Sequence, residues 1–289
     1  MRTIKIEDKD YPKRLLKIKN PPQRLYIEGN EELLNNKSLA IVGSRKCSEY
    51  GIKYAKEFTK EIAENNITIV SGLAIGIDTV AHEVAKECKG NTIAVLGSGM
   101  NHIYPEENQN LYKEILTKGG CIISEYEPNE EVDMKNFPER NRIISGISMG
   151  VLIIEAGYRS GSTITGRYGL NQGKSVFCLP RSIGISNGIG TNELIKKGAA
   201  LVTNPGEILR EFGIKYDLSQ KESNTSIETI EIEKEYQEIY KLISYTPQNI
   251  QYLSQKTGFK IAEITQKLIM MELQGYVKSL PGNYYVKRK

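Results

Sequence analysis

Short apolar runs alternate with longer amphipathic stretches along most of the chain. The runs lie at residues 39–42, 67–70, 92–97, 121–124, 150–156 and 175–180, with a candidate seventh at 200–203. They are continuous rather than alternating, which is typical of strands covered on both faces, and the stretches between them have the length of helices. The pattern predicts a doubly wound α/β domain with a mostly parallel sheet over residues 39–212.

The segments that flank this region have a different pattern of apolar and polar residues. Residues 1–38 contain Pro21-Pro22, which excludes a helix there, so we expect an extended lead-in that covers an edge of the sheet. Residues 213–232 are polar and short of large apolar side chains. Such a composition predicts a linker between two domains.

Residues 233–289 show three helical patterns followed by two short strand patterns around Pro281-Gly282-Asn283. We expect the second helix to begin with Thr246 as its N-cap and Pro247 at its first position. Three helices and a terminal hairpin predict a small winged-helix domain. The third helix mixes cationic and acidic residues, which leaves contact with duplex DNA and contact with a protein both open; these residues are Lys260, Glu263, Lys267 and Glu272.

Composition narrows the class of protein without selecting a function. Hydrophobic residues make up 39% and charged residues 26%, which excludes a disordered chain. The formal net charge of +4 permits nucleic-acid binding but does not argue for it. Four widely spaced cysteines and a charged N-terminus without an apolar segment predict a cytoplasmic protein with no disulfide framework and no membrane contact; the cysteines are Cys47, Cys88, Cys121 and Cys178.

Glycine, serine and arginine follow the strands with unusual regularity. "GSR" follows the first run, "SGLAIGID" the second, "GSGM" the third and "GYRSGSTITGR" the fifth. In an open parallel sheet, ligands bind beyond the carboxyl ends of the strands, where backbone amides at helix N-termini attract anions. The sequence therefore predicts a groove for a long anionic ligand at this edge of the sheet.

Basic residues and one aromatic residue complete the predicted groove. Arg45 is the strongest candidate for a phosphate contact, and Phe137 is a candidate stacking platform for a base. Other functions for these side chains remain open: Phe137 fills the core edge, Arg140 and Arg142 pair with carboxylates, and Lys174 caps a helix. The predicted DNA-binding residues are Gly43, Ser44, Arg45, Ser71, Gly72, Phe137, Arg140, Asn141, Arg142, Ser162, Thr163 and Lys174.

The sequence lacks the motifs of several common cofactor-binding and catalytic sites. No G-x-G-x-x-G follows the first run, and no Walker A motif occurs in the chain. Asp78 and His82 lie four residues apart but have no third ligand, so we expect Asp78 to cap a helix and His82 to be buried. We therefore expect a protein that is not an enzyme and that holds neither a metal ion nor a cofactor.

The ordered motifs "AIVGSR", "IVSGLAIGIDTVAH", "AVLGSGMNHIYPEEN", "FPERNRIISGIS", "EAGYRSGSTIT" and "GTNELIKKGA" resemble those of the DprA/Smf family of DNA-processing proteins, from Tyr11 to about Leu209. The resemblance implies an extended Rossmann-like fold that binds single-stranded DNA as a homodimer, protects it and loads the RecA recombinase during natural transformation. It also implies that Gly43, Ser44 and Arg45 belong to the DNA pocket. Many members carry a helical domain ahead of the Tyr-Pro motif, whereas ten residues precede Tyr11 here.

A second resemblance supplies the alternative function. The stretch "YRSGSTIT" is similar to the P-G-G-x-G-T-x-x-E motif of the lysine-decarboxylase-like phosphoribohydrolases, with Gly161 and Ser162 in place of its Gly-Thr. Thr165 falls where that family has its catalytic glutamate, and a threonine cannot act as the general acid or base there. A hydrolase built on this chain would need another carboxylate, such as Glu155.

Overall fold

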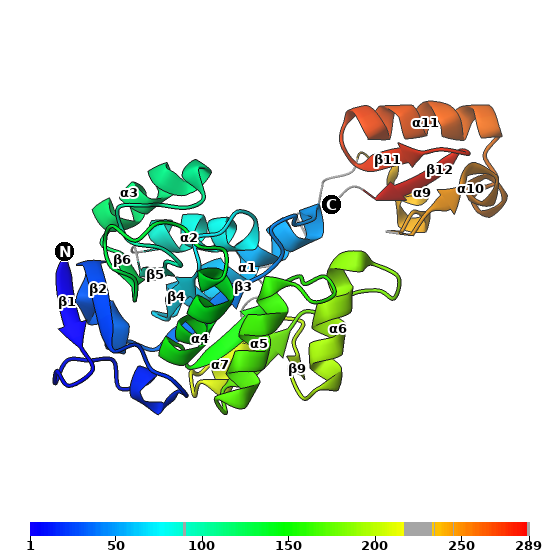
Figure 1. Ribbon diagram of the computed structural model, residues 1–289. Coiled ribbons are helices and arrows are strands. Elements are labelled where there is room, and N and C mark those ends of the chain that lie inside the picture. The colour runs from blue at the N-terminus through cyan, green and yellow to red at the C-terminus, as the bar shows by residue number, and fades with distance from the viewer. Residues whose placement is uncertain (89–90, 217–232, 234, 245, 288–289) are drawn as a thin grey trace. The chain divides into compact units, whose positions relative to one another are not determined.

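The computed structural model describes residues 1–88, 91–216, 233, 235–244 and 246–287 (Figure 1). The chain divides into two compact units, Met1–Tyr216 and Asp217–Lys289. Most of the predicted linker, residues 217–232, lies outside the described residues. Ile214 and Tyr216, at the start of the predicted linker, pack against the core of the first unit.

One mixed sheet forms the centre of the first unit. Its strand order among the described residues is β1-β2-β6-β5-β4-β3-β7-β8-β9. All neighbouring pairs from β6 across to β9 are parallel, which confirms the predicted mostly parallel, doubly wound sheet. The strands are β1 (Arg2–Lys5), β2 (Arg24–Gly29), β3 (Ser38–Val42), β4 (Thr68–Ser71), β5 (Thr92–Val95), β6 (Cys121–Ser124), β7 (Gly150–Ile153), β8 (Ser175–Cys178) and β9 (Ala200–Leu201).

The N-terminal segment covers one edge of this sheet with two paired strands. β1 pairs antiparallel with β2, and β2 pairs antiparallel with β6. Tyr11 and Leu15, in the connection between β1 and β2, are buried, and the Tyr11 hydroxyl donates to the carbonyl of Pro22 at 2.7 Å. The segment is therefore part of the first unit's core.

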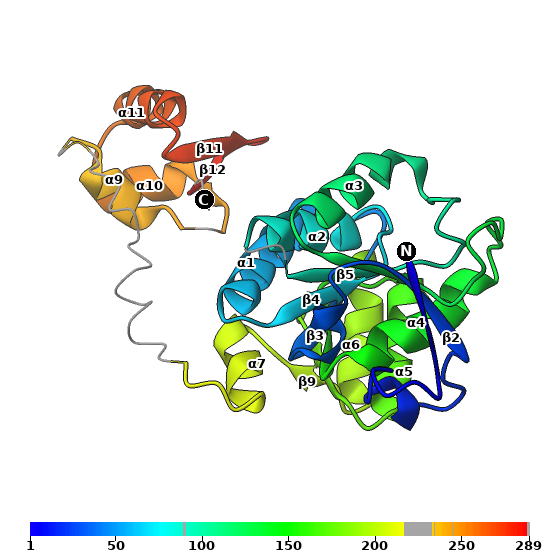
Figure 2. The ribbon, with the colours of Figure 1, turned by 90° about the vertical axis from the view of Figure 1, so that its left-hand side faces the viewer.

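Helices cover both faces of the sheet (Figure 2). Phe58 and Ile62 of α1 pack on one face, where α2, α3 and α7 also lie, and Ile143 and Ile144 of α4 pack on the other face with α5 and α6. The continuous apolar runs therefore form strands that are buried from both sides. The helices are α1 (Glu49–Glu64), α2 (Ile77–Glu87), α3 (Gln109–Thr117), α4 (Asn136–Ile147), α5 (Gly161–Asn171), α6 (Ile189–Lys196) and α7 (Pro205–Glu211), with short 3₁₀ turns η1 (Leu15–Lys17), η2 (Glu31–Asn35), η3 (Glu106–Asn108) and η4 (Ser186–Gly188).

The expected capping function of Asp78 is wrong. α2 begins at Ile77, and its N-cap is Gly76 with a φ of 88°, a conformation that favours glycine. Asp78 lies inside the first turn, where its buried carboxylate accepts a hydrogen bond from the Gly72 amide at 3.0 Å. The carboxylate thus fixes the loop that precedes the helix.

The described residues of the second unit form three helices and a three-stranded antiparallel sheet (Figure 1), which confirms the predicted winged helix. Its core gathers Ile239 from the first helix, Leu253 from the second and Ile264 and Leu268 from the third. The elements are α9 (Gln237–Leu242), β10 (Gln248–Asn249), α10 (Ile250–Thr257), α11 (Ile261–Leu273), β11 (Val277–Leu280) and β12 (Tyr284–Lys287).

The predicted start of the second helix in this unit is wrong by several residues. Gln248 and Asn249 form the short strand β10, which pairs with Tyr285 and Tyr284, so α10 begins only at Ile250. Asn249 provides the N-cap, because its side chain accepts a hydrogen bond from the Gln251 amide at 2.8 Å. Because Gln248 and Asn249 pair with β12, which a local sequence pattern does not reveal, the helix begins later than predicted.

Candidate nucleic-acid interface

A pocket of about 520 Å³ opens at the carboxyl ends of β3 and β7. β3 pairs with β4 on one side and with β7 on the other, so the loops that follow β3 and β7 lead to opposite sides of the sheet. Ligands of open α/β sheets bind at such a switch point. Seven of the predicted DNA-binding residues line this pocket, hereafter the switch-point pocket: Gly43, Ser44, Arg45, Phe137, Arg140, Asn141 and Ser162.

The Gly43–Ser44–Arg45 turn packs tightly against the start of α2. A Cβ at Gly43 would lie 2.5 Å from the Cγ1 of Ile77, so this position requires glycine. The Ser44 carbonyl accepts a hydrogen bond from the Ile77 amide at 3.2 Å. Arg45 is exposed, and its guanidinium carbon lies 5.8 Å from the centre of the Phe137 ring. The fixed turn thus presents an exposed cation in the lining of the pocket.

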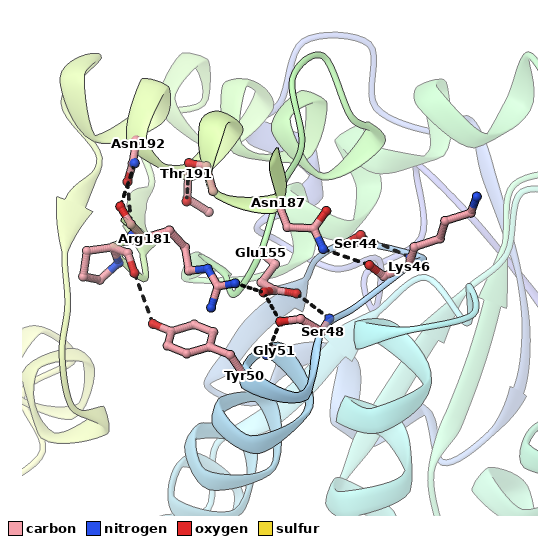
Figure 3. A network of polar contacts seen from close by, with 12 residues as sticks. Ser44, Lys46, Ser48, Tyr50, Gly51, Glu155, Arg181, Asn187, Thr191 and Asn192 are labelled. Atoms are coloured by element: carbon pink, nitrogen blue, oxygen red, sulfur yellow. Dashed lines mark hydrogen bonds and ion pairs between the residues drawn. The ribbon is translucent and has the colours of Figure 1, made fainter. Parts of the chain in front are cut away.

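A buried carboxylate connects this loop to the strands beside it (Figure 3). Glu155, just after β7, is fully buried and accepts hydrogen bonds from the Ser48 amide at 3.0 Å and the Ser48 hydroxyl at 2.5 Å. The Ser48 hydroxyl in turn accepts from the Gly51 amide at 3.2 Å and caps α1. An ion pair at 3.3 Å joins Glu155 to Arg181, whose guanidinium carbon lies 4.0 Å from the Tyr50 ring centre.

The loop after β8 closes another side of the switch-point pocket. The Asn187 side chain donates to the Lys46 carbonyl at 2.9 Å (Figure 3). The Asn187 carbonyl accepts from the Ala156 amide at 2.8 Å. Arg181 and Asn187 were not among the residues that the sequence pointed to. The only local signal was their place after the sixth apolar run, where the same rule about carboxyl ends of strands applies.

Arg140 lies in the pocket wall but directs its guanidinium inward. The residue is 4% exposed, its Nη1 donates to the Gly72 carbonyl at 2.8 Å and to the Val95 carbonyl, and its Nε donates to Asn141 Oδ1 at 3.3 Å. Burial lowers the pKa of Arg140 to about 10, partly offset by the nearby Asp78 carboxylate. Arg140 therefore fastens the loops after β4 and β5 to α4.

Phe137 has features of both interpretations that the sequence left open, a core residue and a stacking platform. It is 8% exposed, and a Cβ at Gly97 would come within 2.7 Å of its ring, so it fills space beneath the loop after β5. It also lines the pocket, with Arg45 on one side and Tyr104 at 5.3 Å between ring centres. Most of its ring is covered in this arrangement.

Arg142 and Lys174 are held away from the pocket. Arg142 forms an ion pair with Glu125 at 2.5 Å, and both side chains are largely buried. Lys174 donates to the carbonyls of Gly146 at 3.2 Å and Ser148 at 2.8 Å, so it caps the end of α4 rather than the end of α5, which precedes it. Burial lowers the pKa of Lys174 to about 8. These contacts match the pairing and capping alternatives for the two residues.

The remaining predicted residues differ in their surroundings. The buried Ser71 hydroxyl donates to the Ile41 carbonyl at 2.7 Å and so joins two strands. Gly72 lines a neighbouring pocket, where a Cβ would lie 2.6 Å from the Arg140 guanidinium. The Thr163 hydroxyl donates to the Ser160 carbonyl at 2.6 Å and borders a third pocket, between α5 and α6.

The position of the missing catalytic glutamate is occupied by a buried threonine. Thr165 lines the switch-point pocket, and its hydroxyl donates to the Gly161 carbonyl at 3.4 Å. His82 is buried with its Nδ1 2.8 Å from the Thr92 hydroxyl. Within the described part of the chain, no group of three or more His, Cys, Asp or Glu residues could hold a metal ion, and no helix has the length and apolarity to cross a membrane.

Comparison with known families identifies both units. The family described as "DNA recombination-mediator protein A" matches residues 2–213, and the family described as "DprA winged helix domain" matches residues 225–283. Both matches agree with the fold of the described residues.

Known proteins extend these matches. The chain is 38% identical to Protein Smf of Escherichia coli over 99% of its own length and 77% of that protein, and 42% identical to DNA processing protein DprA of Streptococcus pneumoniae over 73% and 74%. The crystal structure of the Streptococcus pneumoniae protein superimposes with a TM-score of 0.69 at 40% identity, covering 75% of each chain. A Helicobacter pylori DprA structure, described in terms of its single-stranded DNA binding mode, gives a TM-score of 0.66 at 31% identity over 73% of this chain and 95% of that one.

Proposed function

The chain belongs to the DprA/Smf family of DNA-processing proteins, and on that premise we propose that it binds single-stranded DNA at the switch-point pocket. The Helicobacter pylori relative is described in terms of its single-stranded DNA binding mode, and the two proteins are 31% identical over 73% of this chain. Arg45 is the residue that would contact a phosphate. In this proposal the protein has no catalytic activity and binds single-stranded DNA of many different base sequences.

The observation that carries the proposal is the placement of Arg45. It is exposed at the mouth of the pocket, on a turn fixed by close packing against α2, and it forms no ion pair among the described residues. Arg140, in contrast, donates hydrogen bonds to the backbone carbonyls of Gly72 and Val95. An exposed cation at the switch point of a parallel sheet, beside glycine and serine amides, suits a phosphate of a flexible strand.

The proposal extends to the partners that the family resemblance implies. The protein would act as a homodimer that protects single-stranded DNA and loads RecA during transformation or recombination. The winged-helix unit would contact duplex DNA or a protein partner. Nuclease protection of the bound strand and RecA assembly on it, each measured with and without the protein, test these two activities separately.

The DNA-binding proposal is tested by fluorescence anisotropy with a labelled mixed-sequence oligonucleotide and its duplex, across a series of salt concentrations. The wild type should prefer the single strand, and its log affinity should fall with log salt by about 0.7 for each neutralised phosphate. Arg45→Ala should bind more weakly with a shallower slope. Lys60→Ala, which removes an exposed cation from the far part of α1, is the matched control and should resemble the wild type.

Two outcomes would count against the proposal. Equal affinity of Arg45→Ala and the wild type would remove Arg45 from the site. If the wild type ignores single strands and instead releases the base from a nucleoside monophosphate, the phosphoribohydrolase alternative is correct.

A further inference from the structure

The helix α11 of the second unit is apolar on two faces (Figure 1). Its inward face packs on the core of the unit through Ile264, Leu268 and Met271. Other apolar side chains of the same helix are exposed, and Leu273 is 77% exposed. A helix that is apolar all round is normally covered on every side, so the outward face of α11 calls for a partner. The exposed apolar residues are Ile261, Ile269, Met270 and Leu273.

The outward face has the spacing of a coiled-coil contact. Four exposed residues follow one another at intervals of four, three and four positions: Ala262, Gln266, Ile269 and Leu273. This spacing brings them onto one line along the helix, as the a and d positions of a heptad do. Met270 lies beside this line. The four residues are hereafter called the α11 seam.

The charges of α11 do not suit a DNA groove. A helix that enters the groove of a duplex usually presents cations to the phosphates. Lys267 is the one cation within α11, and its Nζ lies 5.8 Å from the Phe259 ring centre and 6.0 Å from the Tyr236 ring centre. The cation thus faces aromatic side chains of its own unit. Glu263 is exposed near the start of the helix, where it would repel a phosphate. The outward face therefore fits an apolar protein surface better than DNA.

A second copy of α11 complements the α11 seam when the two helices run antiparallel. Ala262 of one helix then packs against Leu273 of the second copy, and Gln266 packs against Ile269. Each layer combines a shorter or polar side chain with a large apolar one, which fills the contact evenly. A parallel pair would oppose Ala262 with Ala262 and Gln266 with Gln266, so one layer would be poorly filled and one would be polar.

The charges beside the seam permit this self-pairing. In the antiparallel pair, Glu263 lies beside Met270 of the second copy. Glu272 accepts hydrogen bonds from the Ser279 amide at 2.8 Å and the Ser279 hydroxyl at 2.7 Å, so it is turned toward its own sheet. Like charges therefore do not meet across the pair, although both helices have the same sequence. A strongly charged partner helix, in contrast, would find no opposite charge on the seam.

The length of the seam limits how strongly it can hold two copies. α11 has 13 residues, which is about 20 Å of helix. Four seam residues from each copy fall short of the roughly 1,200 Å² that a stable interface buries. The contact would therefore form between units that are already linked, where the effective concentration is high. The proposed homodimer supplies this condition.

We propose that the winged-helix units of two chains pair antiparallel along the α11 seam within the proposed homodimer. The inference rests on the proposed function in this one respect, and it does not require bound DNA. It names the protein partner of the winged-helix unit as a second copy of this chain. While the units are paired, α11 is not available to a DNA groove.

Disulfide cross-linking of the full chain tests the pairing and its direction. All variants carry Cys47→Ser and Cys88→Ser, because these two native thiols are partly exposed. Antiparallel pairing places residue 262 opposite residue 273 of the second copy, so the double variant Ala262→Cys, Leu273→Cys should form disulfide-linked dimers under mild oxidation. The two positions are about 16 Å apart in one helix, too far for a disulfide within the chain. Each single cysteine variant should stay unlinked, because equal positions are equally far apart across the pair.

A charge substitution in the double-cysteine variant tests the seam itself. Ile269→Asp should lower the linked fraction about tenfold, because both copies would bury a carboxylate without a partner. Ile261→Asp is the matched control: it changes an exposed isoleucine of the same helix that lies off the seam, and the linked fraction should not change. Unfolding midpoints of both variants should equal that of the double-cysteine chain, since both side chains are exposed.

Sedimentation of the wild type separates this inference from the proposed homodimer. A dimeric wild type with no disulfide in the double variant would overturn the α11 pairing and leave the homodimer in place. A monomeric wild type would contradict the homodimer and the pairing with it. Strong linking of Leu273→Cys alone would show a parallel pair, contrary to the proposal. If Ile269→Asp weakens duplex DNA binding and leaves the linked fraction unchanged, α11 contacts DNA and the inference is wrong.

Discussion

Replacing Glu155 with glutamine should destabilise the first unit strongly. The Glu155 carboxylate is fully buried and joins three loops, since it accepts two hydrogen bonds from Ser48 and an ion pair from Arg181. Glutamine has the same shape but carries no charge and has one acceptor oxygen instead of two. The substitution therefore leaves the Arg181 guanidinium without its anionic partner and directs an amide N–H toward groups that are themselves donors.

The contacts set the size of the effect. Removing one partner of a buried ion pair costs about 3–5 kcal/mol, because the other charge remains buried without compensation. Arg181 is 14% exposed, so water reaches it in part and the low end of that range applies. The Tyr50 ring, 4.0 Å from the guanidinium carbon, keeps part of the cation's stabilisation. We expect the free energy of unfolding to fall by about 3 kcal/mol.

Urea unfolding of the wild type and Glu155→Gln, followed by circular dichroism, measures this loss. Glu64→Gln is the matched control, since it breaks an exposed ion pair with Lys60 at 3.8 Å and should cost about 1 kcal/mol or less. A loss in Glu155→Gln no larger than that of the control would show that the buried carboxylate does not hold the loops together.

Three further predictions concern other parts of the first unit. Gly43→Ala should lower the free energy of unfolding by about 1–3 kcal/mol, because the new methyl group meets Ile77, whereas Gly161→Ala, which meets nothing within 4 Å, should not; thermal unfolding distinguishes the two. Burial lowers the pKa of Lys174 from 10.5 to about 8, so between these pH values the unfolded chain binds more protons than the folded chain and the free energy of unfolding rises with pH. In urea unfolding repeated from pH 8 to pH 10.5, the wild type should therefore gain stability relative to Lys174→Met. A difference between the two proteins that stays constant over this range would contradict the assignment. Native protein should react with a thiol reagent at partly exposed Cys47 and Cys88 before Cys121 and Cys178, whose burial raises their pKa to about 12; modification of all four at one rate would contradict the buried positions.

The sequence was sufficient for the parallel strands of the large sheet and for naming Arg45 as a candidate phosphate contact. Continuous apolar runs mark strands buried on both faces, and the residue type alone makes Arg45 a candidate, because no local partner is in sight. Arg142 and Lys174 were equally good candidates by residue type. Their partners, Glu125 and the end of α4, come from other segments, and only the folded chain brings them together.

Long-range pairing also explains what sequence reasoning missed. Ser48 and Glu155 are 107 residues apart, and nothing near either of them in the sequence indicates the contact. Phe137 shows the same limit, because the sequence left it between a core position and a stacking platform. Only the fold shows that it is 8% exposed, with the Arg45 guanidinium carbon 5.8 Å from its ring centre. A periodicity argument assigns residues to faces, but it does not say which side chain covers another.

The two edges of the large sheet bear on how copies of this protein associate. Edge strands with free backbone groups promote aggregation and sheet extension, and proteins limit this with short or charged edges. β9 has two residues, and β1 has four, with Arg2 and Lys5 exposed on either side of buried Ile4. Neither edge offers a long apolar strand to a second chain. The proposed homodimer is therefore expected to form through packing of side chains rather than through continuation of the sheet.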